Sequence, residues 1–292
     1  MDEFSPHSQP LIATVPPLAA HPARPVWEWN GDYARSARFD LAGSVRRWPL
    51  WGLLGWQDVM LRYRRSFIGP FWLTISMGVM VFSLGYIYGG IFVLDLDNYL
   101  PFLTIGFLVW GLITAMLSDG CQTFIEIEWI IRQVDLPLSM FPLRVVWRNL
   151  IVFLHNAVIY LVLLLLFNLR PGWTLLLAIP GLLLVLANGL WCAMLLGMLS
   201  ARFRDLPQIV SSVLQVAFFI TPIIWLPHMA ANRPLLMEAN PFYHFIEVVR
   251  APMLGQLPSL SNWGVTLGIG IAGWIGTYLF FRRYHGRIAY WV

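Results

Sequence analysis

Few side chains in this sequence have the types and spacing that catalysis or metal binding requires. His244 and Glu247 stand three residues apart, so a helix would present both on one face, as two metal ligands require. No further histidine, cysteine or acid joins them at ligand spacing. We therefore favour capping and local hydrogen bonding for this pair, and the sequence predicts neither a metal centre nor catalytic residues.

Two further ionisable residues lie inside or beside long apolar runs. His155 is within such a run, where an ionisable group is a candidate for function. It can also stay neutral and hydrogen-bond a neighbouring helix, which is the interpretation that we favour. Asp119 lies close to the end of another run, where it can reach water or an arginine. We find no G-x-S-x-G or H-E-x-x-H motif and no aspartate pair within a run, so nothing indicates hydrolytic chemistry.

A basic cluster, Arg62, Arg64 and Arg65, precedes a Gly-Pro pair at the start of the first apolar run. Positive charge next to a membrane span anchors that span on the cytoplasmic side. Guanidinium groups also bind phosphate oxygens through two parallel hydrogen bonds, which suits recognition of a phosphate at the membrane surface. The cluster alone is compatible with both interpretations.

Six aromatic residues gather in the outer halves of the first and fifth apolar runs. As a group they could line a path for sugar rings, whose C–H faces stack on aromatic planes. Any one of them is more often a lipid-facing or core residue. These candidate channel-lining residues are Phe82, Tyr86, Tyr88, Phe218, Phe219 and Trp225.

The composition places all of these residues in a membrane protein. Hydrophobic residues make up 58% of the chain and charged residues only 12%, with a mean hydropathy of +0.67. A soluble domain carries about 25% charge. All basic residues are arginines, so the lysine that a P-loop places on nucleotide phosphates is missing. If transport here uses ATP, another subunit must bind it.

Six apolar runs come close to or exceed the roughly 20 residues that cross a bilayer. Sixteen arginines fall on one side of the alternation and three on the other. Since basic loops stay in the cytoplasm, we predict an all-α integral membrane protein with six transmembrane helices and both termini cytoplasmic. The predicted spans are 67–93, 99–124, 145–169, 173–199, 209–226 and 263–281.

The first of these spans follows two distinct segments. Residues 1–47 form a proline-rich tail and lead-in, and residues 48–66 have the tryptophan-bearing apolar face and basic end of an amphipathic helix in the membrane interface. Residues 67–292 then form the transmembrane domain.

Two connections within that domain are more than linkers. The cytoplasmic residues 126–143 have a helical pattern of their own and predict a docking site. The outer residues 227–262 contain Asn240-Pro241, which starts a helix too short to cross the bilayer. We expect short re-entrant helices there, with irregular backbone buried in protein or lining a cavity.

Several motifs resemble those of the ABC-2 type permeases that export O-antigen, capsular polysaccharide or teichoic acid. Residues 58–72, DVMLRYRRSFIGPFW, are similar to the family's D-x-x-x-R-Y-x-x-S-x-L-G-P-x-W pattern before the first span. Residues 202–206 (RFRDL) and 221–223 (TPI) form a second match, and Asn240-Pro241 with Arg250 and Gly255 a third. Pro137 and Pro142 fit the proline pattern of the family's coupling loop.

The resemblance implies the membrane subunit of a transporter in the bacterial inner membrane, most like an O-antigen exporter permease. It implies a homodimer, bound to two copies of a separate cytoplasmic ATPase that holds ATP and Mg²⁺, with no cofactor in this chain. The expected cargo is an undecaprenyl-pyrophosphate-linked polysaccharide that moves among membrane lipids, and no nucleic acid takes part.

The resemblance also implies residue roles. Arg62, Arg64 and Arg65 would recognise the pyrophosphate where the substrate comes in. The coupling helix within 126–143 would contact the ATPase through Glu126, Glu128, Trp129, Arg132 and Asp135. An outer gate would include Asn240, Pro241, Tyr243 and Arg250.

Two alternatives remain open at this point. One is an ABC-2 exporter of a small lipid or drug, which only the motif from Arg62 to Trp72 disfavours. The other is a membrane-embedded enzyme of lipid-linked glycan metabolism. Such an enzyme needs converging acids or a Ser/His pair, and neither is visible.

Overall fold

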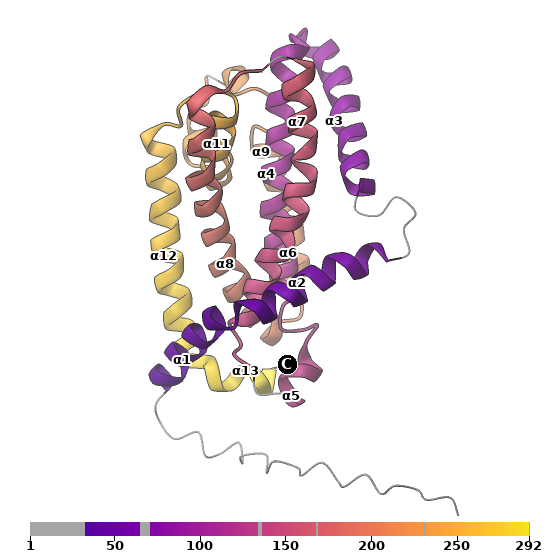
Figure 1. The fold of residues 1–292 in the computed structure, drawn as a ribbon. Coiled ribbons are helices and arrows are strands. Elements are labelled where there is room, and N and C mark those ends of the chain that lie inside the picture. Colours follow the sequence, from indigo (N-terminus) through magenta and orange to yellow (C-terminus); the bar gives the residue numbers. More distant parts are fainter. Residues whose placement is uncertain (1–32, 65–70, 134–135, 168, 231, 292) are drawn as a thin grey trace, which may run out of the picture. The chain divides into compact units, whose positions relative to one another are not determined.

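The computed structural model describes residues 33–64, 71–133, 136–167, 169–230 and 232–291. By their contacts, residues 1–32 and 33–292 separate into two units, and only the second is described here. The described residues form helices joined by turns, with no β-strand among them (Figure 1). The all-helical fold predicted from the sequence is therefore confirmed for this part of the chain.

Five helical segments are long and apolar enough to cross a membrane, and they coincide with five of the six predicted spans. They contain α3 (Phe71–Phe92), α4 (Leu96–Gln122), α6 (Met140–Asn156) with α7 (Val158–Leu166), η2 (Gly172–Leu177) with α8 (Ala178–Arg202), and α12 (Leu260–Tyr284). Between α6 and α7 the helix is interrupted at Ala157.

The predicted fifth span corresponds to α9 (Leu206–Ile220), which has only 15 residues. At 1.5 Å per residue it is about 22 Å long, shorter than the roughly 30 Å of a hydrocarbon core. The helix stops because Pro222 follows Thr221, and a residue before proline favours the extended conformation that Thr221 adopts. Six complete crossings thus remain a prediction.

The central helix is α4. In its most apolar window 78% of the residues are buried, against 17% for α3. It packs against α3, α6, α7, α8, α9 and α11 (Pro241–Met253). Glycine allows the closest approach, since a Cβ on Gly120 would lie 2.6 Å from the Cα of Ala193 in α8. Small residues at helix crossings are what apolar helices use to pack in a membrane.

Four short elements gather at one end of the bundle: α1 (Tyr33–Arg46), α5 (Glu128–Gln133), η4 (His285–Arg287) and α13 (Ile288–Trp291). The helix α2 (Trp48–Tyr63) lies beside them and runs across the bundle rather than along it (Figure 1). A second apolar core forms here, separate from the core around α4, and includes Phe124, Met140, Phe281 and Ile288.

At the opposite end, η3 (Pro227–Ala230) and α10 (Leu235–Glu238) lead into α11. The 13 residues of α11 are too few to cross a bilayer, as predicted for this segment. Gly181 of α8 meets the α11 backbone so closely that a Cβ there would overlap the carbonyl oxygen of Val248.

We therefore predict that Gly181→Ala lowers stability by roughly 1–3 kcal/mol, because the methyl group forces α11 away from α8. The thermal unfolding midpoint of the purified protein in detergent measures this. Gly264→Ala in α12 is the matched control, since a Cβ there meets nothing within 4 Å. Equal midpoints for the two variants would contradict the close packing of α8 and α11.

Candidate functional site

A network of charged side chains joins α2, α4 and α6. Arg144 donates two hydrogen bonds to the carboxylate of Asp58, from Nε at 2.7 Å and Nη2 at 2.5 Å. Arg148 lies 3.5 Å from Asp58 through Nη1 and donates to Asp119 at 2.7 Å through Nη2. Asn149 donates to the same oxygen of Asp119 at 3.0 Å. Two guanidinium groups and two carboxylates thus neutralise one another at the junction of three helices.

The local sequence explains this geometry. Arg144 and Arg148 are four residues apart, so they lie on the same face of α6. Gly55 lets α2 cross that face closely, because a Cβ there would lie 2.8 Å from the Trp147 ring. All four charged side chains are at most 26% exposed, so water alone does not solvate their charges and each needs an ionic partner.

Of the two partners expected for Asp119, water or an arginine, the structure shows an arginine, Arg148. The roles of Arg144, Arg148 and Asp58 were not foreseen, although Asp58 is part of the quoted motif. The available signal was a pair of arginines four residues apart in one segment, with an aspartate opposite in another. Sequence periodicity does not reveal which two helices bring such residues together.

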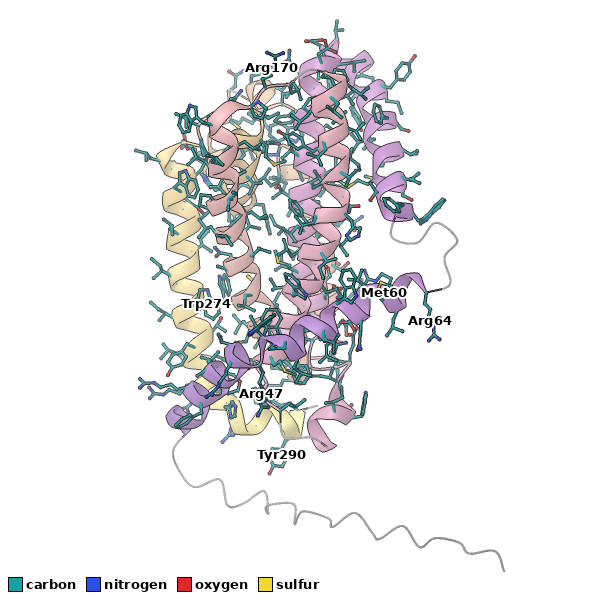
Figure 2. The ribbon with its side chains drawn as sticks, viewed as in Figure 1. Arg47, Met60, Arg64, Arg170, Trp274 and Tyr290 are labelled. Atoms are coloured by element: carbon teal, nitrogen blue, oxygen red, sulfur yellow. The ribbon has the colours of Figure 1, made fainter. Side chains whose placement is uncertain are left out.

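The predicted phosphate cluster lies at the far end of α2. The side chains of Arg62 and Arg64 are exposed and make no hydrogen bond or ion pair with the described residues. In Figure 2 the side chain of Arg64 points away from the bundle. Arg65 lies outside the described residues. Two of the three arginines are therefore free to bind a ligand or a lipid headgroup.

The six predicted channel aromatics do not form one cluster among the described residues. On α9, Phe218 packs in the core against Phe107 and Trp110, with ring centroids 5.7 and 5.9 Å away. The neighbouring Phe219 is 66% exposed, and Trp225 donates to its carbonyl at 3.2 Å.

On α3, Phe82 and Tyr86 are exposed, whereas Tyr88 stacks on Phe92. Phe82, Tyr86 and Phe219 are thus the members that present rings on the outside of the subunit.

The predicted coupling segment contains α5, whose six residues follow a turn after α4. Trp129 is 61% exposed, and Glu126 is exposed beside it. Glu128 is half-buried. On the inner side of the segment, Ile127 and Ile130 belong to or pack on the second core. The side chain of Arg132 and all of Asp135 lie outside the described residues.

At the other end, Arg250 of α11 is the largest fully buried side chain among the described residues. It pairs with Glu247 one turn earlier and donates to the carbonyl oxygen of Pro222 at 2.7 Å. Its guanidinium carbon lies 3.9 Å from the centre of the Phe102 ring, a cation–π contact. Arg250 thereby fastens α11 to α4 and to the turn after α9.

The start of α11 is fastened in the same way. Asn240 caps the helix by accepting from the backbone N–H of Phe242, and it donates to Thr221 at 2.8 Å. Pro241 occupies the first helical position. Tyr243 is half-buried and meets the ring of His244 edge to face, with centroids 5.4 Å apart.

His244 has hydrogen-bond partners, one of them local, as favoured above. That ring lies within hydrogen-bond distance of Asn262 Oδ1 and the carbonyl of Glu238, at 2.8 and 2.9 Å. The described residues contain no group of three potential metal ligands. His155 differs from our expectation, because its Nδ1 lies 2.8 Å from the carbonyl of Ile151 in its own helix rather than near a neighbouring one.

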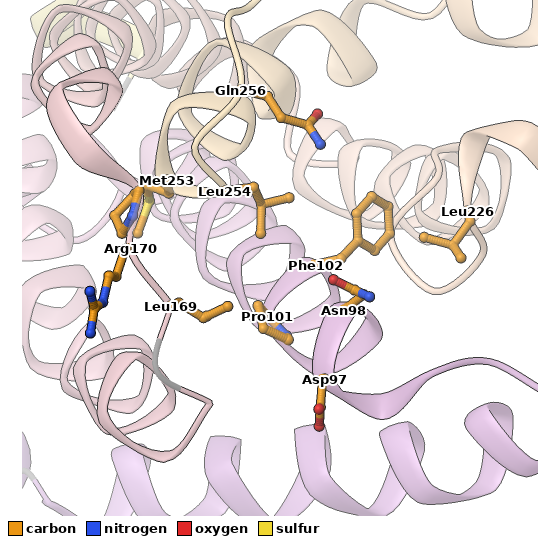
Figure 3. A pocket seen from close by; sticks show the side chains of 11 residues that line it. Asp97, Asn98, Pro101, Phe102, Leu169, Arg170, Leu226, Met253, Leu254 and Gln256 are labelled. Carbon is orange, nitrogen blue, oxygen red and sulfur yellow. The ribbon is translucent and has the colours of Figure 1, made fainter.

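A pocket of about 340 Å³, lined by both polar and apolar side chains, opens between the start of α4 and the end of α11, and Arg170 is among its lining residues (Figure 3). The side chains of Asn98, Phe102, Leu254 and Gln256 are among those that line it. Phe102, whose ring Arg250 contacts, thus also lines this pocket.

We predict that Asp58→Asn destabilises the protein by roughly 2–3 kcal/mol, because Arg144 loses charge-assisted hydrogen bonds in a half-buried site. Thermal or denaturant unfolding in detergent measures the loss. Asp205→Asn changes an exposed aspartate without a side-chain cap hydrogen bond and should leave stability unchanged.

The double variant Asp58→Asn/Arg144→Gln should lose less than the sum of the two single variants. Strict additivity would mean that the pair does not interact.

Comparison with known proteins identifies relatives of this chain. The profile of the ABC-2 type transporter family matches residues 49–254, which contain the charge network, the segment 126–143 and α11. An O-antigen export system permease protein RfbA of Myxococcus xanthus is 26% identical over 190 residues, covering 63% of this chain and 72% of that protein. Its namesake in Klebsiella pneumoniae is 24% identical over 182 residues, covering 61% and 69%. The family profile spans well over half of the sequence, and the chain therefore belongs to the ABC-2 type transporter family.

Proposed function

We propose that this chain is the membrane subunit of an ABC exporter that moves a lipid-linked polysaccharide, an O-antigen or a similar polymer, across the bacterial inner membrane. The observation that carries the proposal is the family match over residues 49–254, together with relatives that are named O-antigen export permeases. ATP hydrolysis occurs on a separate subunit, in keeping with the absence of any lysine for a P-loop.

The chain crosses the membrane six times, with both termini in the cytoplasm. The end of the bundle that carries α1, α2, α5 and α13 is the cytoplasmic one, since sixteen of nineteen arginines belong to the segments predicted there. Although α9 is short, it starts just after α8 ends at Arg202 and leads to Thr221, which bonds Asn240 at the opposite end. Together with the turn after it, α9 thus provides the fifth crossing.

The exposed helix faces support a homodimer. The most apolar window of α3 is 17% buried, and α9 exposes Val213, Val216 and Phe219. A second copy that covers these faces would place the exposed aromatics Phe82, Tyr86 and Phe219 along a shared channel. Sugar rings would stack on these side chains as the polymer passes.

The cytoplasmic ATPase docks on the segment 126–143. In this segment Trp129 is exposed, whereas Ile127 is buried in the second core. An exposed tryptophan on a well-packed base is typical of an anchor residue in an interface. Two copies of the ATPase bind the two subunits of the dimer. Glu126, Glu128, Arg132 and Asp135 would supply the polar part of this contact.

At the outer end, α11 forms the gate. Arg250 and Asn240 hold its two ends against the turn after α9, so a movement of α9 along the channel pulls on both ends of α11. Pro241 and Tyr243, near the start of α11, are the residues that would face the emerging polymer.

Trp129→Ala tests the docking site. In a complex reconstituted with the cognate ATPase we expect at least a tenfold loss of export, because a buried interface tryptophan commonly contributes 2 kcal/mol or more. The purified chain alone should bind no ATP. Trp173→Ala is the control, since Trp173 is equally exposed at 66% but lies near the other end.

ATP bound by the isolated chain, or normal export by Trp129→Ala, would contradict the proposed division between the two subunits.

We also expect Arg62 and Arg64 to hold the phosphate groups of the lipid-linked cargo. Membrane anchoring needs only positive charge, whereas bidentate phosphate binding needs the planar guanidinium. Arg62→Lys and Arg64→Lys should therefore reduce export roughly tenfold or more, with insertion unchanged. The assay is surface polysaccharide in cells that carry each variant.

Arg46→Lys, at an exposed arginine of α1, is the control. If all three lysine variants export like the parent, the cluster serves only to anchor the span.

A further inference from the structure

Three distant segments of the chain meet at one buried carboxylate. Asp40 of α1 is 8% exposed. It accepts hydrogen bonds from the backbone N–H groups of Leu138 and Ser139, at 2.7 and 2.9 Å, and from the Ser139 hydroxyl at 2.5 Å. His285 Nε2 lies 3.0 Å from the same carboxylate. A buried contact between the hydroxyls of Ser44 and Ser139, at 2.7 Å, completes what we call the Asp40 junction.

The partners of Asp40 belong to parts of the subunit that the chain itself does not place together. Leu138 and Ser139 lie in the second half of the coupling segment 126–143 and directly precede α6. His285 directly follows α12 and leads into α13, which packs against α5 and α8. One side chain therefore joins the first helix, the coupling segment and the chain's last membrane helix.

Apolar packing alone would not need a carboxylate at this place. The surrounding second core includes Ala37, Met140, Phe281 and Ile288, and it would hold the elements together without a charge. Burying a carboxylate is unfavourable unless several donors satisfy it. Bonds to two successive backbone N–H groups also fix the position of α1 relative to the coupling segment, which apolar contacts do only loosely.

From this geometry we infer that Asp40 is a positioning residue through which a movement of the coupling segment reaches α12 and α13. The inference rests on the proposed function, in which the ATPase moves residues 126–143. Movement reaches α6 through the chain itself. The Asp40 junction provides a second route, so that the third and the sixth membrane helices respond to the same nucleotide event.

Two variants and one matched control test this route. Asp40→Asn keeps the shape but removes the charge, and it places an amide N–H₂ where one of the donors now binds. His285→Ala removes the contact that His285 makes with Asp40 and leaves the bonds to Leu138 and Ser139. Asp97→Asn is the matched control, because Asp97 is an exposed aspartate at the opposite end whose carboxylate has no partner among the described residues.

The experiment is hydrogen–deuterium exchange on the full transporter complex in lipid nanodiscs, with and without ATP. In the parent and in Asp97→Asn, ATP should change exchange both in residues 126–143 and in residues 280–291. In Asp40→Asn and His285→Ala the change in 126–143 should persist, and the change in 280–291 should fall by roughly tenfold, the effect of losing a charge-assisted hydrogen bond.

In the same two variants, the amount of polysaccharide exported per ATP hydrolysed should also fall. An unchanged response at 280–291 in both variants overturns the inference. An equal loss of the exchange response in 126–143 and 280–291 also overturns the inference. Failure of both variants to assemble with the ATPase does the same, since a merely structural role would have those effects.

The exchange response does not depend on the cargo. If the parent complex hydrolyses ATP and exports no polysaccharide, the proposed cargo is wrong, whereas the Asp40 junction is still judged on exchange in residues 280–291.

Discussion

Every charged group that this chain takes out of water must find a partner inside the protein, and this constraint decides how its apolar helices fit together. Helices made mostly of leucine, valine and isoleucine can pack on each other in many registers, because lipid tails are as apolar as they are. Arg148 on α6 restricts the packing, because its two carboxylate partners lie on two different helices. The network around Asp58 therefore selects one arrangement of α2, α4 and α6.

The same constraint operates at both ends of the bundle. Arg250 is 1% exposed and is satisfied by Glu247, the carbonyl of Pro222 and the Phe102 ring. Helix α11, the turn after α9 and α4 must therefore meet there. Asp40 does the same for α1, the coupling segment and the end of α12. Between the ends, close contacts depend on glycine, as at Gly120 and Gly181. The helices are thus held by specific polar contacts at the two ends of the bundle and by apolar packing between them.

Hydropathy and the distribution of arginines predict much of this fold, because an apolar run of about 20 residues has few alternatives to a membrane helix. Five predicted spans coincide with helices of sufficient length. The fifth span differs because a proline at 222 ends α9 early, and an apolar average over 18 residues does not register that. Helix α1 also falls within residues 1–47, for which the sequence predicts a tail and lead-in.

The candidate site is harder to predict, since its residues act in pairs drawn from different helices. Arg250 was expected at the gate, but its cation–π contact with Phe102 depends on a helix that begins about 150 residues earlier in the chain. The aromatics of α3 and α9 show how neighbouring residues can take different surroundings. Phe218 and Phe219 both belong to the predicted group of channel-lining residues, yet Phe218 packs into the core and Phe219 is exposed.

The location of the lipid-linked polymer in cells that lack this chain tests the central claim most directly. If the chain is the export subunit, surface polysaccharide disappears, and the full-length polymer accumulates on its lipid carrier at the cytoplasmic face of the inner membrane. Restoring the chain returns the polymer to the surface. Normal surface polysaccharide in its absence, or a block in polymer synthesis without accumulation, would contradict the account.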